Sequence, residues 1–168
     1  MGETLKLTDS ESIEIVGSGA QGLEVEATYG PGGTAPPKHL HPAQDERFRV
    51  IEGKIRAVAG DEQRELEAGD ELEIPRGVAH QMWNPYEGPA RVSWITSPAG
   101  RTADWFRAVD ALVRAARAGG VGGALSFGAL LDEYDDTFRL AVAPTPVVGV
   151  AVKALGFAGR LTGHGPDR

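Results

Sequence analysis

A chain of 168 residues with 41% hydrophobic and 24% charged residues is long enough for one compact globular domain and too short for two full ones. Its formal charge of -7 argues against the phosphate backbone of a nucleic acid as the main partner. The sequence contains no cysteine, which excludes disulfides and thiolate metal sites. Its start lacks the basic and apolar regions of a signal peptide, so we expect a cytoplasmic protein.

The first hundred residues have the patterning of an all-β domain. Glycines and prolines separate short runs in which apolar and polar residues alternate, and residues 1–10 form either a loose arm or an edge strand. Eight or so short strands at this spacing predict a closed or sandwiched antiparallel sheet, which can hold one small ligand. We expect strands near 13–15, 23–29, 47–52, 54–58, 64–67, 72–74, 80–84 and 92–96, with turns at 16–19, 30–33 and 52–53.

The candidate metal ligands lie between residues 39 and 46 and at one later position. His39 and His41 point to the same face if this stretch is extended, and Glu46 follows after a short turn. His80 could bring a third imidazole to the same place. Three imidazoles and one carboxylate suit one divalent transition metal (Fe, Mn, Ni, Co, Cu or Zn) rather than Ca or Mg. Gln44 is an alternative or supporting oxygen ligand, and the competing interpretation is that these are polar residues of a domain without metal.

Several other side chains have both a functional and a structural interpretation. Phe48, Met82 and Trp94 could form the apolar wall of a substrate pocket, or belong to the ordinary core, because lining and core are continuous in a small barrel. Arg56 and Arg76 could hold a carboxylate group of a substrate, but solvated surface positions are favoured for both.

The pattern changes near residue 100 from alternation to helical spacing. A first helix begins near residue 102, and a second carries the apolar residues of 127–138 on one stripe. Trp105 and Phe106 could cap the barrel mouth or a subunit interface, although contact with the core is favoured. A third helix at 147–161 is apolar almost all round, so it is expected to be buried, and it is too short to span a bilayer. His164 falls in a frayed end and is expected to be exposed and unrelated to the metal.

Two sets of spaced residues resemble the two sequence motifs of the cupin superfamily. Every position and gap of both motifs is present within residues 33–84. The first set consists of Gly33, His39, His41, Glu46 and Gly53, and the second of Gly69, Pro75, Gly77, His80 and Asn84. The resemblance implies a cupin (double-stranded β-helix or jelly-roll) barrel of six to eight strands, whose metal is held by His39, His41, Glu46 and His80.

We therefore expect an all-β cupin barrel at residues 10–98, followed by a three-helix C-terminal extension at residues 101–161. The resemblance implies a mononuclear metal-dependent enzyme, an oxygenase of the dioxygenase-like type, that acts through this metal on a small organic or aromatic molecule. Two alternatives stay open: metal-assisted isomerase, cyclase or lyase chemistry, which needs no O₂, and a non-catalytic cupin that binds a small molecule. Proteins that resemble this chain are commonly homodimers, and neither a nucleic-acid partner nor a membrane span is expected.

Overall fold

The computed structural model describes residues 2–20, 22–115 and 121–141 of the chain. The helix expected at 147–161 and the fourth histidine, His164, lie outside the described residues. Within them, no helix is long and apolar enough to cross a membrane.

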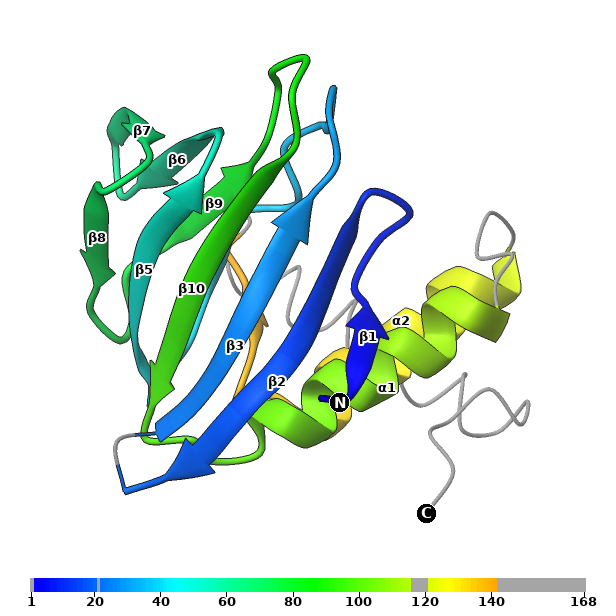
Figure 1. The fold of residues 1–168 in the computed structure, drawn as a ribbon. Helices are drawn as coiled ribbons and strands as arrows, with labels where there is room; N and C mark the ends of the chain where they lie inside the picture. Colours follow the sequence, from blue (N-terminus) through cyan, green and yellow to red (C-terminus); the bar gives the residue numbers. More distant parts are fainter. Residues whose placement is uncertain (1, 21, 116–120, 142–168) are drawn as a thin grey trace.

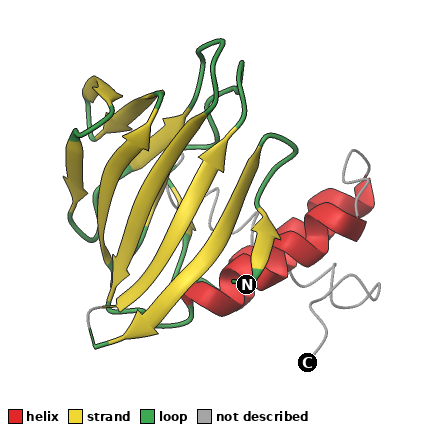
Figure 2. Cartoon of the chain, in the orientation of Figure 1, coloured by secondary structure: helices red, strands yellow, loops and turns green. Residues whose placement is uncertain are grey.

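Two antiparallel sheets make up most of the fold (Figures 1 and 2). The larger sheet contains, in spatial order, β1 (Thr4–Lys6), β2 (Glu11–Gly19), β3 (Gly22–Tyr29), β10 (Ala90–Ser97), β5 (Asp45–Glu52) and β8 (Glu71–Ile74). The smaller sheet contains β11 (Arg139–Leu140), β4 (His39–Leu40), β9 (His80–Trp83), β6 (Lys54–Ala59) and β7 (Glu62–Glu67). The prediction of an antiparallel all-β domain is confirmed, and residues 4–6 form an edge strand.

The core lies on the inner faces of these sheets. Buried and partly exposed residues alternate along β10, where Val92 and Trp94 point inward. On the neighbouring β5, Phe48 and Val50 are buried on the same face as Glu46, as their shared parity predicted. Apolar side chains from both sheets form one cluster, which leaves a polar carboxylate inside an apolar interior.

Two helices follow the strands, α1 (Thr102–Ala115) and α2 (Val121–Glu133). Figure 1 shows them side by side, next to β1 and β2. Trp105 and Phe106 of α1 are buried in the same core cluster as the strands. The Asp110 carboxylate of α1 accepts a hydrogen bond of 2.7 Å from the backbone N–H of Lys6, which ties the helix to the edge strand.

The expectation that one helix carries the apolar stripe of 127–138 is wrong at its end, because α2 stops at Glu133. The chain then turns, with the backbone N–H groups of Thr137 and Phe138 both donating to the carbonyl of Tyr134. Beyond this turn, β11 pairs with β4 and adds a strand to the smaller sheet. The pairing places the residues just after the turn next to the strand that carries His39.

Candidate metal centre

Three histidines converge at adjacent strands of the smaller sheet. His39 begins β4, His41 follows directly after this strand, and His80 begins β9 as the cross-strand partner of His39. Their candidate ligand nitrogens all lie within 4.8 Å of one another. The two histidines of the first motif and the one of the second therefore meet in space, as the spacing predicted.

Backbone carbonyls fix the protonation of all three rings. A carbonyl oxygen can only accept a hydrogen bond, so Nδ1 carries a proton in each ring, and when the ring is neutral Nε2 keeps its lone pair. The Nδ1 atoms of His39, His41 and His80 lie 3.0, 2.7 and 3.0 Å from the carbonyl oxygens of Pro37, Thr137 and Val78, respectively. Neutral imidazoles with an unprotonated Nε2 are the form that binds a transition metal.

Glu46 completes the cluster from the larger sheet, with only 2% of its surface exposed. Its Oε1 lies 3.3 Å from His41 Nε2, and its Oε2 lies 3.0 Å from His80 Nε2. Such separations fit two ligands that each lie about 2.1 Å from a single ion and subtend roughly a right angle. The indole N–H of Trp94 donates a 3.0 Å hydrogen bond to Glu46 Oε1 and holds the carboxylate in place.

The electrostatics of the cluster favour a bound cation. Burial alone would raise the pKa of Glu46, but the neighbouring His41 and His80 outweigh it and lower that pKa. Burial would lower the pKa of His80, but Glu46 outweighs it and raises that pKa, so a metal bound here would replace a proton on this ring. Burial, reinforced by His80 and His41, lowers the pKa of His39 to about 3, so this ring stays neutral. Among the residues that the structure describes, neither His41 Nε2 nor Glu46 Oε2 has a hydrogen-bond donor, although both are buried. Clustered, buried acceptors without donors fit a divalent transition metal, which would satisfy them together.

A cavity of about 190 Å³ adjoins the three histidines. For comparison, an engineered cavity of about 150 Å³ in another protein is large enough to bind benzene. Phe48, Met82 and Trp94, the side chains expected in a substrate pocket, all line this cavity. The histidines are therefore exposed to an apolar space with room for one aromatic ring, and are not enclosed on every side.

The C-terminal extension supplies part of this site, which the motifs could not indicate. The ring of Phe138 stacks on that of His39, with centroids 4.6 Å apart. Trp105 also stacks on Phe138, and these two centroids are 4.6 Å apart as well. Trp105 and Phe106 line the cavity as well as the core. The carbonyl that fixes the protonation of His41 also comes from this extension, at Thr137.

Two further cavity residues were missed in the sequence, Glu11 and Tyr29. They are direct cross-strand partners on β2 and β3, and their side chains are hydrogen-bonded. Burial raises the pKa of Glu11 to about 7, although the hydrogen bond to Tyr29 opposes this shift. The sequence did contain a signal for Glu11. This residue shares its face of the strand with the apolar Ile13 and Ile15, so an acidic residue occupies a position where the alternation predicts an apolar core residue.

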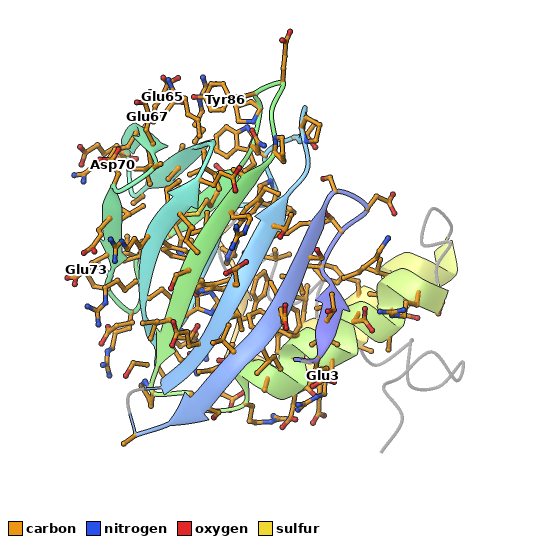
Figure 3. All side chains as sticks on the ribbon, viewed as in Figure 1. Glu3, Glu65, Glu67, Asp70, Glu73 and Tyr86 are labelled. Carbon is orange, nitrogen blue, oxygen red and sulfur yellow. The ribbon has the colours of Figure 1, made fainter. Side chains whose placement is uncertain are left out.

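Three candidate residues do not join the site. Arg56 of β6 pairs at 2.8 Å with Glu65, its cross-strand partner on β7, which Figure 3 labels beside Tyr86. Arg76 pairs with Asp45 at 2.6 Å on the surface. Gln44 is buried, but it is not among the residues that line the cavity. The arginines thus occupy the surface positions favoured from the sequence.

Comparisons with known proteins agree with the fold. Residues 25–96 match the family model described as Cupin domain. A stretch of 53 residues is 43% identical to the oxidoreductase iacF of Pestalotiopsis fici, covering 31% of this chain and 26% of that protein. The structure of KdgF from Halomonas sp. is similar with a TM-score of 0.53 and 16% identity, over 60% of this chain and 90% of that chain. The cupin domain of Schizosaccharomyces pombe Cnp3 gives a TM-score of 0.50 and 12% identity, over 61% and 72% of the two chains.

Proposed function

Because this chain belongs to the cupin superfamily, with residues 25–96 forming the matched domain, we propose that it is a metal-dependent oxygenase of small aromatic or other organic molecules. His39, His41, Glu46 and His80 would hold one divalent transition metal. The observation that carries the proposal is that the three histidines line an apolar cavity, while Glu46 stands behind them. A metal held in this way keeps a side open to a ligand in the cavity.

Each part of the site has a role that follows from its contacts. A bound metal of this class supplies Lewis-acid chemistry and, for iron, a site for O₂. The backbone carbonyls orient the three imidazoles, and Trp94 orients Glu46, so the ligands are held before the metal binds. Phe48, Met82 and Trp94 place the ring of an aromatic substrate beside the histidines and exclude water from it.

The choice of oxygenase rests on the similarity to a protein named as an oxidoreductase. That match spans about a quarter of the fungal protein, so the activity of this chain is proposed and not transferred. Metal-assisted isomerase or cyclase chemistry is the second candidate, and Glu11 favours it, because a carboxyl group with a pKa of about 7 in the same cavity suits proton transfer at neutral pH. The two candidates differ in their need for O₂.

Metal content tests the proposal first. We expect near-stoichiometric Fe, Mn, Ni, Co, Cu or Zn in untagged protein by elemental mass spectrometry, and its loss from the His41→Ala and His80→Ala variants. His164→Ala removes the remaining histidine and serves as the matched control, which should keep its metal. Light scattering on the same preparations tests whether the chain forms the expected homodimer. Absence of metal from the wild type, even after anaerobic reconstitution, would refute the metalloenzyme proposal.

Oxygen consumption then separates the functions. Protein loaded anaerobically with each metal is mixed with a panel of single-ring phenols and catechols in an oxygen electrode. Consumption of O₂ that depends on the substrate and is lost in His80→Ala supports the oxygenase. Turnover of a compound at the same rate without O₂ would select isomerase or cyclase chemistry. Tight binding of a compound without turnover under either condition would select a non-catalytic binding protein.

A further inference from the structure

The cavity has a second polar region besides the histidines. Glu11 and Tyr29 both line it, and they face each other across β2 and β3. Glu11 is half-buried and Tyr29 is buried, with 5% of its surface exposed. Both side chains point to the face that carries Ile13 and Ala27, so neither is on the outer surface of the sheet.

This pair is separate from the metal ligands. Tyr29 lies opposite Ala90 on β10, whereas Glu46 lies opposite Thr96, so the two polar regions start from backbone positions six residues apart along one strand. This offset separates the backbones only, since the side chains of both regions reach toward the same cavity and the Glu46 charge still contributes to the pKa of Tyr29. A ligand that fills the cavity could therefore meet polar groups at two places.

Among the described residues, the side chain that shifts the pKa of Glu11 is Tyr29, through its hydrogen bond to the carboxyl. Burial, the Glu11 carboxyl and, more weakly, Glu46 raise the pKa of Tyr29 well above its ordinary value, so the phenol stays neutral. The other ionisable groups described in the cavity lining are the three histidines. Within the described part of the chain, the turn after β1 and the two helices contribute uncharged side chains to the cavity: Leu7, Thr8, Trp105, Phe106, Val109 and Phe127.

We propose that Glu11 and Tyr29 form a second binding subsite, in which the protonated Glu11 carboxyl donates a hydrogen bond to an uncharged acceptor group of the substrate, such as a carbonyl or ether oxygen. The inference rests on the proposed function in that both use one cavity. It narrows the substrate to single-ring compounds that carry an acceptor in addition to the group that meets the metal. An anionic group at this position is disfavoured at neutral pH, because the ionised fraction of Glu11 repels it and the described residues that line the cavity include no lysine or arginine to balance its charge.

The binding of acetophenone to the full-length chain tests this subsite. Acetophenone is neutral, does not titrate and carries one carbonyl acceptor, and ethylbenzene is the control of similar size without an acceptor. Trp94 and Trp105 line the cavity, so tryptophan fluorescence reports occupancy. Between pH 6 and pH 8 we expect the affinity for acetophenone to fall about tenfold, since Glu11 loses its donor proton and a buried hydrogen bond to a neutral acceptor is lost. The affinity for ethylbenzene should stay constant.

Two variants assign this pH dependence to Glu11. In Glu11→Gln the affinity for acetophenone should be independent of pH, because an amide keeps its donor throughout. In Tyr29→Phe the midpoint should move to higher pH, because the tyrosine hydrogen bond lowers the pKa of Glu11. An unchanged pH dependence in Glu11→Gln would overturn the proposal, as would an affinity for acetophenone at pH 6 no greater than that for ethylbenzene.

The same titration is run on protein as isolated and after removal of metal by a chelator. A subsite formed by Glu11 and Tyr29 should give the same pH dependence in both. Failure of this test, together with intact metal binding and oxygen consumption, would refute the subsite and leave the oxygenase standing. The expected pH dependence in protein that never binds metal would support the subsite and refute the oxygenase proposal.

Discussion

Replacing Glu11 by glutamine should make the protein more stable at alkaline pH. Burial raises the pKa of this carboxyl from 4.5 to about 7 in the folded state, so the folded chain holds a proton that the unfolded chain has released. Between these two values the folded state binds more protons than the unfolded one, and the free energy of unfolding falls as pH rises. The loss is complete above about pH 7. Glutamine, which cannot ionise, avoids it.

The size of the effect follows from the shift. Each pKa unit corresponds to about 1.4 kcal/mol, so a displacement from 4.5 to about 7 sets an upper limit of roughly 3.5 kcal/mol. Glu11 is only half-buried, since its carboxyl faces the cavity, and water there reduces the cost of its charge. We therefore expect a difference of about 2 kcal/mol between the variant and the wild type at pH 8, over and above their difference at pH 4.

Urea unfolding at several pH values measures this difference. The stability of Glu11→Gln relative to the wild type should rise through pH 5 to 7 and then level off. Glu14→Gln is the matched control, because it removes a carboxylate from the exposed face of the same strand. A difference that is flat between pH 4 and pH 8, or that falls as pH rises, would refute the argument that Glu11 is held neutral by burial in the cavity.

Three further changes test the contacts around the site. Trp94→Phe removes the donor to Glu46, and chelator competition should show metal affinity reduced by about tenfold or more. Phe138→Ala removes a ring that stacks at the cavity and should lower the free energy of unfolding by about 2 kcal/mol in urea, less than a fully buried phenylalanine would. Gly53→Ala should cost at least ~2 kcal/mol in the same assay, because its φ is +79° and a Cβ would overlap the Pro89 carbonyl oxygen; Gly60→Ala, with φ +59° and open space around it, should cost only about 1 kcal/mol.

The strands were predictable because each follows a local period of two. The glycines were ambiguous, because they fit either a turn or an irregular position within a strand. Residues 16–19 were expected to turn, whereas β2 continues to Gly19. The register of β2 against β3 shifts between Ile15 and Gly17, and Val16 is left 62% exposed. Both a turn and a β-bulge need flexible residues at an irregular backbone position, so glycine alone does not distinguish them.

The convergence of His39, His41 and His80 was predictable for a similar reason, since their spacing along two strands fixes which faces they share. The residues that surround these histidines were not predictable from the sequence. Thr137 and His41 are 96 residues apart in sequence, and their contact depends on how β11 docks beside β4. The helical period was extended over 127–138 because the apolar spacing persists past Glu133, but strand pairing of Arg139 and Leu140 overrides it.

The motif residues at 33–84 and the residues that flank them contribute differently to the proposed function. The motif residues bring three histidines and Glu46 together, and nothing in residues 33–84 alone determines which ligand enters the cavity beside them. Glu11 precedes this stretch, whereas Trp105 and Phe138 follow it, and all three line the cavity. A protein that shares the histidines and the glutamate but has other residues at these positions would offer its metal to a different ligand. The substrate of this chain must therefore be sought through the shape and polarity that the flanking segments give the cavity, with Glu11 as the group that most restricts it.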